Sequence, residues 1–395
     1  MSTEDSAAPD QPADAPEELT DEEARAHLGV SSGTGLSKKR TIIGAVVAIA
    51  FLAIVFWRVI PQIGDYSGAW DTITAMTWSD VTMLVIVVII YLFIYGWPFV
   101  AAVPGLKYKN GFIVNQSAFT VSNGIPGGGA FGLGLQYAQL TSYKTTPTAA
   151  TAGIGATGVW SVFITLGLPI TGIAGLALSG DDASNYATAA VLGLAALALV
   201  VGLFALILRS ESTATKIGQF GDKITNPILA KFGRGWRVDL TSMVLSLRHD
   251  IVSLVRRRWI VITVAQIAVS WSQFAILYAA LVAVTGHNGT VPLLAAYGSW
   301  AISQIGIMIP ITPGGLGTVD AVLIGLLTAV GVSAADATAA ALVWRAASYV
   351  PQMAIGLICI FYWRWQERNR RLAESDAGAN SPAPVNPSEG DANEK

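Results

Sequence analysis

Six long apolar tracts constrain this chain more than any other feature of its sequence. A helix needs about 20 apolar residues to cross a bilayer, and backbone groups in lipid must find partners within their own segment. Only 13% of the 395 residues are charged, against roughly 25% in soluble domains. We therefore predict an all-α polytopic membrane protein whose spanning helices cover Thr41–Trp57, Val81–Val103, Ala149–Leu178, Asn185–Leu208, Trp259–Val284 and Ala335–Trp363.

Charged residues between these tracts predict the orientation of the chain. Lysine and arginine concentrate on the cytoplasmic side of membrane proteins. Here they precede the first tract, fill residues 209–258 and follow the last tract, whereas aspartates follow the first and third tracts. Six crossings satisfy these signs with both termini in the cytoplasm. The Ala- and Gly-rich tracts and acidic tails indicate a multi-pass protein of a bacterial cell (inner) membrane.

The chain is expected to divide into two membrane halves, 38–208 and 259–365, joined by the connector 209–258. Apolar residues recur in the connector at three- and four-residue steps, between basic residues. This pattern predicts one or two amphipathic helices on the cytoplasmic face, attracted to anionic lipid; a solvated charged loop is the alternative. Residues 1–37 and 366–395 are polar and proline-containing, so they are predicted to be disordered cytoplasmic tails.

Two further apolar segments, 112–143 and 291–332, are interrupted by prolines and glycines. Because six crossings already satisfy the predicted orientation, each of these segments must return to the side of the membrane that it left. Each does so either as a re-entrant segment of half depth or as a full hairpin. The predicted topology makes the first enter from the cytoplasm and the second from outside. Such a pair of Gly/Pro-interrupted segments is typical of an inverted repeat around a transporter's central site.

The interruptions predict a polar cavity near the middle of the membrane. The two motifs are Pro126-Gly127-Gly128 and Pro313-Gly314-Gly315. Proline breaks the helical hydrogen bonding, and an unsatisfied backbone group in hydrocarbon costs several kcal/mol, so broken backbone must lie against protein or water. A helix that restarts there directs free N–H groups at the cavity and favours a phosphate or a carboxylate. Close packing of helices against glycine is the alternative, and it is preferred for Gly153, Gly155, Gly158, Gly172 and Gly175.

Two charged residues lie within the apolar tracts of the second half. Asp320 follows the second break and Arg345 lies inside the last tract. Buried charges in membranes face a cavity or each other. Two interpretations stay open: Arg345 binds an anionic headgroup while Asp320 balances charge or carries a proton, or the two form a structural ion pair. Several polar residues either line the path or bond a neighbouring helix, namely Asn115, Gln116, Asn123, Gln136, Gln139, Gln304 and Gln352.

The motifs of the last third resemble those of a known family. The stretches "PITPGGLGTVDA" and "WRAASYVPQMAIG" place an acid after the broken segment, then an Arg, an aromatic residue, a Pro and a Gly in a later helix. This pattern resembles the lysylphosphatidylglycerol synthase transmembrane family, also called the flippase-like or UPF0104 family. The first half departs from it, because the charges that the family usually places after the first-half proline are absent. The resemblance implies movement of a lipid or lipid-linked headgroup between leaflets.

Little in the sequence points to catalysis. One cysteine, Cys359, and three scattered histidines exclude a disulfide framework and a cysteine-based zinc site, and no G-x-x-x-x-G-K-[ST] nucleotide loop occurs. We therefore expect no enzyme activity, no catalytic residue, no metal, no cofactor and no nucleic-acid partner.

The expected function is a flippase or scramblase for a phospholipid or a lipid-linked anionic headgroup. The alternatives are a secondary transporter of a small soluble anion and a non-catalytic scaffold for a lipid-modifying or glycosyl-transferring partner. The oligomeric state stays open. The residues expected to bind the substrate are Pro126, Gly127, Gly128, Pro313, Gly314, Gly315, Gly317, Asp320, Arg345 and Tyr349.

Overall fold

A computed structural model describes residues 66–124, 128–179, 209–232, 240–286, 291–308 and 313–379, with isolated positions at 20, 195, 198, 199, 202, 203 and 206. The elements within these ranges are helices, as expected for an all-α protein. The predicted span at 41–57 and nearly all of the one at 185–208 lie outside the described residues.

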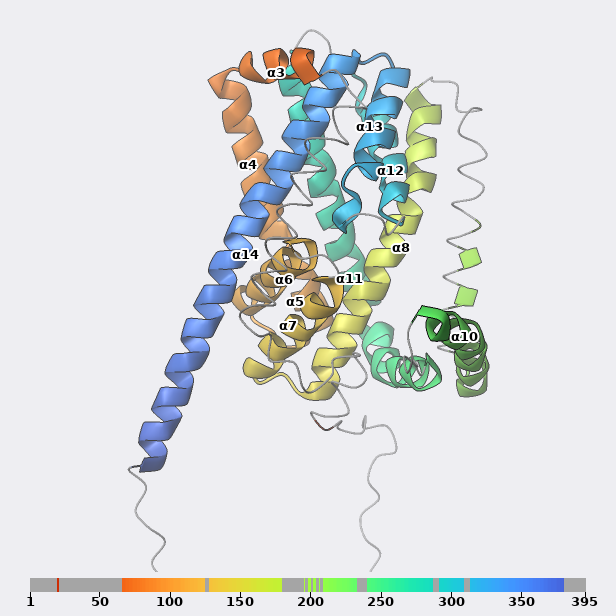
Figure 1. Cartoon of the computed structure of the whole chain (residues 1–395), viewed down its shortest axis with the longest axis vertical. Helices are drawn as coiled ribbons and strands as arrows, with labels where there is room; N and C mark the ends of the chain where they lie inside the picture. Colours follow the sequence, from red (N-terminus) through yellow and green to blue (C-terminus); the bar gives the residue numbers. More distant parts are fainter. Residues whose placement is uncertain are drawn as a thin grey trace, which may run out of the picture.

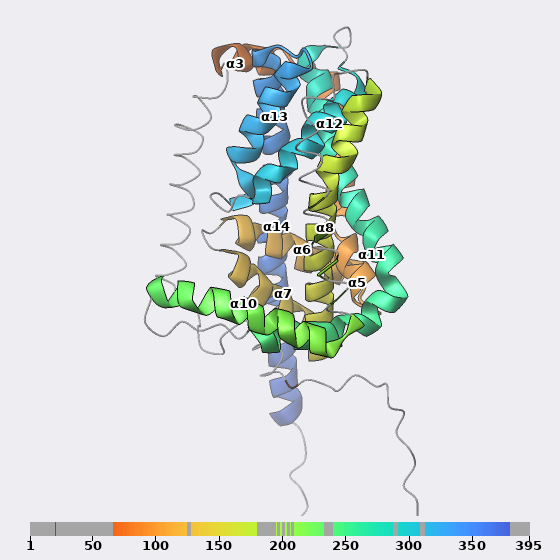
Figure 2. The same cartoon turned by 90° about the vertical axis from the view of Figure 1, so that its right-hand side faces the viewer.

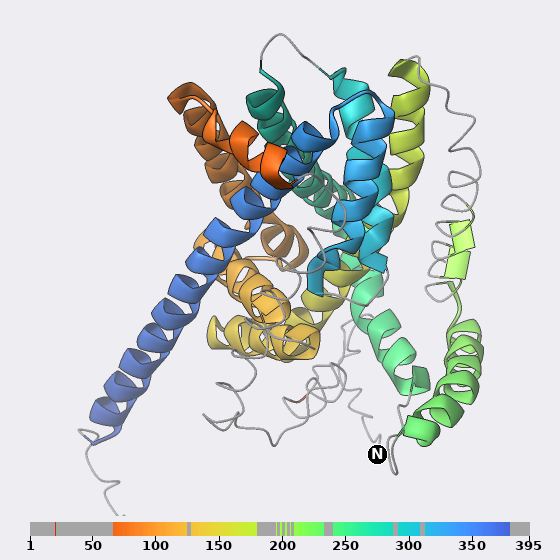
Figure 3. The same ribbon diagram turned by 45° about the horizontal axis from the view of Figure 1, so that its top comes forward.

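Four helical stretches in the described part are long and apolar enough to cross a membrane, and they confirm four of the six predicted spans. The first joins α4 (Trp78–Ile94) to α5 (Trp97–Ala102). The others lie in α8 (Pro147–Ser179), α11 (Leu240–Thr285) and α14 (Ala334–Ala379). The short helix α3 (Tyr66–Thr74) lies across one end of the bundle, where Figure 3 shows it crossing the start of α14.

The surfaces of these helices are apolar where they face outward. Large hydrophobic side chains that would be buried in a soluble protein are exposed on α4, α11 and α14. A contiguous apolar surface of this kind marks contact with lipid, so the chain is a multi-pass membrane protein. The exposed residues include Val85, Ile86, Ile89, Ile90, Val261, Val264, Ile358 and Phe361.

Both interrupted segments form pairs of short helices. The first pair is α6 (Tyr108–Gly124) and α7 (Gly128–Ser142), on either side of residues 125–127, which are not described. The second contains α12 (Leu293–Ser303), the 3-10 turns η4 (Gln304–Met308) and η5 (Pro313–Gly315), and α13 (Thr318–Ala329).

Neither pair runs the length of the bundle. Figure 1 shows α6 and α7 in its lower half and α12 and α13 in its upper half. This arrangement agrees with entry from opposite ends, while an inverted repeat stays a prediction.

Helix α10 (Glu211–Phe232) lies across the lower end of the bundle, roughly at right angles to the long helices (Figure 2). The Asp222 carboxylate accepts hydrogen bonds from the backbone N–H and the hydroxyl of Thr241, at 3.2 and 2.7 Å. These bonds hold α10 against the start of α11. The described parts of the connector are helical, and α11 continues into the membrane span without a break.

Glycines let α8 approach α12 closely. A methyl group added to Gly172 would lie 3.0 Å from the Gly298 carbonyl oxygen, and one added to Gly298 would lie 2.5 Å from the Leu176 side chain. The packing interpretation is confirmed for Gly172, and Gly153 and Gly175 have similar close contacts. Gly158 differs, because nothing lies within 4 Å of an added methyl group there.

Candidate functional site

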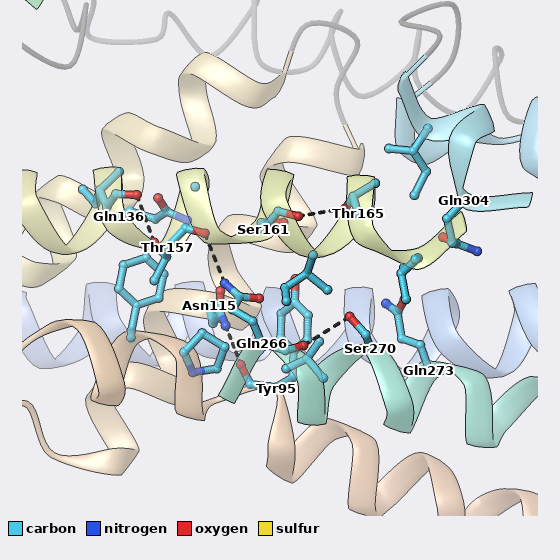
Figure 4. A pocket seen from close by; sticks show the side chains of 18 of the residues that line it. Tyr95, Asn115, Gln136, Thr157, Ser161, Thr165, Gln266, Ser270, Gln273 and Gln304 are labelled. Carbon is cyan, nitrogen blue, oxygen red and sulfur yellow. Dashed lines mark hydrogen bonds between the residues drawn. The ribbon is translucent and has the colours of Figure 1, made fainter. Parts of the chain in front are cut away.

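A cavity of about 360 Å³ lies among α5, α6, α7, α8, α11, α12 and η4. Ten of its lining residues are polar and the others are apolar or glycine; none of the residues found to line it is charged. Figure 4 shows the polar side chains converging from several helices. They are Tyr95, Asn115, Gln136, Thr157, Ser161, Thr165, Gln266, Ser270, Gln273 and Gln304.

Two helices contribute most of this polar lining. Thr157, Ser161 and Thr165 follow one another at four-residue steps on α8, and Gln266 and Gln273 flank Ser270 on α11. Residues three or four apart share one helix face, so each helix presents a polar stripe to the cavity. Neither stripe was among the residues predicted from the sequence. Their signal was present, because polar residues recur at helical spacing within tracts that are otherwise apolar.

The amide side chains are oriented by hydrogen bonds to the backbone. Gln266 donates from Nε2 to the Thr157 carbonyl at 3.1 Å, and Gln304 donates to the Trp300 carbonyl at 3.3 Å. Asn115 donates to the carbonyl of Tyr95. A carbonyl oxygen can only accept, so these contacts fix which end of each amide is nitrogen. The three amide oxygens have no donor among the described residues.

The hydroxyl groups are used in a similar way. Thr157 donates to the Gly153 carbonyl at 2.8 Å, Thr165 to Ser161 at 2.9 Å and Ser270 to Gln266 at 3.2 Å. Such bonds to the preceding turn satisfy the hydroxyl proton of Ser and Thr within helices. What these hydroxyls offer to the cavity is therefore their lone pairs.

Exposed lining residues mark a mouth of the cavity. Leu133 on α7 is 39% exposed and Ile307 in η4 is 44% exposed, and Ser161 on α8 is exposed as well. Ser161 lies near the middle of α8, and the other two lie near the breaks of the two helix pairs. The mouth is thus at mid-length of the bundle and has apolar side chains beside a polar one.

The charged residues singled out in the sequence lie in direct contact with each other. Arg345 donates from Nε to the Asp320 carboxylate at 2.6 Å, and both side chains are 5% exposed. The other Asp320 oxygen accepts the backbone N–H of Gly317 at 2.8 Å, at the start of α13. The pair therefore joins α13 to α14 and places a carboxylate at a helix N-terminus, which is where the helix dipole favours it.

Arg345 also satisfies the backbone of the second break. Its Nη1 donates to the Gly314 carbonyl at 3.3 Å and its Nη2 to the Gly315 carbonyl at 3.4 Å. The Tyr349 hydroxyl accepts from Nη1 at 3.2 Å and donates to the Gly314 carbonyl at 3.1 Å. These glycines have left-handed backbone, with φ of +63° and +68°. The helix can break here inside the membrane because side chains replace the missing helical bonds.

Of the predicted substrate-binding residues, those that the structure describes do not line the cavity. Pro126 and Gly127 lie outside the described residues, and Gly128 packs against α6, where an added methyl group would lie 2.2 Å from the Val121 carbonyl oxygen. The remaining seven gather around the second break and the ion pair. Their part in binding a substrate stays a prediction. The seven are Pro313, Gly314, Gly315, Gly317, Asp320, Arg345 and Tyr349.

The other predicted polar residues divide into two sets. Asn115, Gln136 and Gln304 line the cavity. Among the rest, Gln116 donates to the Leu92 carbonyl at 3.4 Å and Gln139 to the Ser117 hydroxyl at 3.1 Å. Asn123 bonds within its own helix, and Gln352 accepts from Tyr91. Gln116, Gln139 and Gln352 therefore bond a neighbouring helix, which was the alternative interpretation, whereas Asn123 fits neither one.

A short chain of contacts joins the cavity to α14. Gln273, in the lining, donates to the Tyr91 hydroxyl at 3.2 Å, and Tyr91 donates to the Gln352 amide oxygen at 2.6 Å. Gln352 lies two turns after Arg345 on the same helix. Polar contacts thus connect the helix that carries the buried arginine to the cavity wall.

Comparison with known proteins agrees with these features. The family model described as lysylphosphatidylglycerol synthase TM region matches residues 42–356. A curated relative, a "UPF0104 membrane protein" of Methanothermobacter thermautotrophicus, is 38% identical over 90 residues, which cover 22% of this chain and 24% of that protein. The match thus spans about a quarter of the relative's length, whereas the family model covers most of the chain. The chain therefore belongs to the lysylphosphatidylglycerol synthase TM region family.

Proposed function

We propose that this protein moves the headgroup of a membrane lipid between leaflets, as a flippase or scramblase without catalysis of its own. The observation that carries the proposal is an uncharged polar cavity inside an apolar bundle, with a mouth at mid-length. A polar headgroup that crosses hydrocarbon loses its hydrogen bonds to water, which costs several kcal/mol per unsatisfied group. The lining side chains replace those bonds during passage.

The size and edges of the cavity favour a lipid over a soluble solute. A volume of about 360 Å³ lies at the low end of the roughly 300–1,000 Å³ range of small-molecule pockets, so it suits a headgroup and not a whole lipid. Leu133 and Ile307 at the mouth are apolar and exposed. In this proposal the acyl chains remain outside, against these side chains, while the headgroup enters.

Asp320 and Arg345 have a positioning role in the proposal. The guanidinium is already bonded to a carboxylate and to the carbonyls of Gly314 and Gly315. Its charge is thereby balanced within the protein. We propose that the pair keeps the second break in shape and so keeps η4, which contributes to the cavity wall, in place.

The charges at the two ends of the bundle support a proposed orientation. Basic residues meet polar groups at the lower end of Figure 1, where Lys109 donates to the Tyr362 hydroxyl at 2.6 Å and Arg370 to the Ser142 carbonyl at 2.7 Å. Asp71 and Asp336 lie at the opposite end, in α3 and at the start of α14. We propose that the basic end faces the cytoplasm of a bacterial inner membrane.

Leaflet exchange in reconstituted vesicles tests the function. Purified protein is reconstituted with lipids that carry a fluorophore on an acyl chain, and dithionite is added to bleach the outer leaflet. The proposal predicts bleaching well beyond the outer-leaflet fraction with protein, and only that fraction in protein-free vesicles. A soluble fluorophore trapped in the same vesicles controls for leakage. Equal bleaching with and without folded protein would contradict the proposal.

A further inference from the structure

The chemistry of the cavity lining is more specific than polarity alone. We infer that the cavity takes an uncharged, hydroxyl-rich headgroup, such as a sugar or a polyol, and disfavours a bare phosphate or an ammonium group. This inference rests on the proposed function and narrows its substrate class. It departs from the anionic headgroup that the sequence led us to expect.

The first argument is charge. None of the residues found to line the cavity is charged. The nearby buried cation, Arg345, is paired with Asp320 at 2.6 Å and is not part of the lining. Burying an ion without a partner is strongly unfavourable, because neutral dipoles replace hydration only in part. An anionic or a cationic group would therefore enter this cavity at a cost that a neutral group avoids.

The second argument is the balance of donors and acceptors. The hydroxyls of Thr157, Thr165 and Ser270 donate hydrogen bonds to backbone carbonyls, so toward the cavity they can only accept. The amides of Gln266 and Gln304 each donate one N–H to a backbone carbonyl. Each amide then has an acceptor oxygen and a second N–H for a ligand. The lining thus presents many acceptors and some donors.

Ligand groups differ in how well they match such a lining. A phosphate is an acceptor only, and its oxygens would face the lone pairs of the hydroxyls. An ammonium group is a donor only, and it brings a charge that no lining carboxylate balances. A hydroxyl group both donates and accepts, so several hydroxyls on one ring or chain can use both kinds of partner. Aromatic side chains of Tyr95, Phe99 and Trp300 add apolar surface for the C–H faces of such a ligand.

A panel of headgroups on one labelled diacylglycerol tests the inference. Proteoliposomes receive glucosyl-diacylglycerol, phosphatidylglycerol or phosphatidylethanolamine, each with the same fluorophore on one acyl chain. The expected result is glucosyl-lipid exchange at least about tenfold faster than either phospholipid, which corresponds to about 1.4 kcal/mol in the barrier. Equal or faster exchange of either phospholipid would overturn the inference and leave the proposed function intact. No exchange of any lipid would overturn both.

An uptake experiment with a free sugar distinguishes a lipid-linked sugar from a soluble one as the substrate. The same vesicles are given radiolabelled glucose outside. We expect no uptake above that of protein-free vesicles, and uptake without lipid exchange would overturn the lipid assignment.

Two lining variants connect the selectivity to the cavity. Gln266→Met keeps the length of the side chain and removes the amide, and Ser161→Ala removes an exposed hydroxyl of the lining. Both are expected to lower glucosyl-lipid exchange several-fold. The matched control is Gln219→Met on α10, which is exposed and outside the cavity. Unchanged exchange in both lining variants would overturn the inference.

Discussion

Arg345 shows at the scale of one residue how a membrane helix pair tolerates a break. Its five N–H donors lie in a rigid fork. In the structure they reach a carboxylate, a tyrosine hydroxyl and the carbonyls of Gly314 and Gly315. Together with the hydroxyls of Tyr349 and Thr318, this side chain satisfies the backbone carbonyls of the break in the membrane interior.

Removing either partner of the buried pair is expected to destabilise the protein strongly. Asp320→Asn leaves the guanidinium without a counter-charge, and Arg345→Met leaves a buried carboxylate without a counter-charge and removes one donor from each of the two glycine carbonyls. Each single change is expected to cost about 3–5 kcal/mol. The measurement is the free energy of unfolding in detergent. The double variant should lose clearly less than the sum of the two, and additive losses would contradict a direct ion pair.

The sequence was informative about these residues only in part. Asp320 and Arg345 could be selected because charges inside apolar tracts are rare. Because they are 25 positions apart in the sequence, their spacing does not show whether the two side chains face each other or a ligand. That choice depends on how α13 and α14 pack, which a single sequence does not specify. For this reason the sequence left both interpretations open.

At the scale of elements, the crossing of α8 and α12 depends on small residues. An added methyl group at Gly298 would lie 2.5 Å from Leu176 and 2.7 Å from the Gly172 carbonyl oxygen. Backbone cannot move aside as a flexible side chain can. Glycine at this crossing therefore sets how closely α12, and with it η4, approaches the cavity.

Gly298→Ala is expected to destabilise the protein by about 1–3 kcal/mol, the usual cost of overpacking. The control is Gly325→Ala on α13, where nothing lies within 4 Å of the added methyl group. In a helix interior that change should be neutral or stabilising, by up to about 1 kcal/mol. Thermal unfolding of both variants in detergent checks the pair. Equal stability of the two variants would show that the crossing is looser than described.

The elements differ in how readily the sequence revealed them. The long apolar tracts identified the four spans that the structure describes, and the Pro-Gly motifs identified both interrupted segments. A polar cavity was predicted, but most of its lining residues were not, because helix breaks and buried charges are stronger signals than single polar residues. The polar stripes on α8 and α11 are isolated Thr, Ser and Gln residues in apolar tracts. A single polar residue of this kind commonly forms a hydrogen bond within its own helix. A binding surface is indicated only when several such residues share one face of a helix.

At the scale of the molecule, the two ends of the bundle differ in charge. Single cysteines test which end faces which side. In a Cys359→Ala background, Lys144→Cys lies in the turn between α7 and α8, and Ser333→Cys lies in the turn before α14. In intact cells, an impermeant maleimide should label position 333 and not position 144. Labelling of 144 alone would reverse the orientation, and labelling of both from one side would contradict the placement of these turns at opposite ends.

We propose that a lipid headgroup passes through the cavity lined by α7, α8 and α11. Gly158 lies in the cavity lining, and nothing lies within 4 Å of a methyl group added there. Gly158→Leu should therefore fold normally and fill the path. Gly167→Leu is the matched control, because Gly167 lies on the same helix, has equally open surroundings and is not part of the lining.

The most direct measurement is the rate of leaflet exchange for these two variants in the same vesicle preparation. We predict that Gly158→Leu slows exchange at least about tenfold, equivalent to about 1.4 kcal/mol in the barrier, while Gly167→Leu remains within about twofold of the parent protein. Normal exchange by a stably folded Gly158→Leu protein would contradict passage through this cavity.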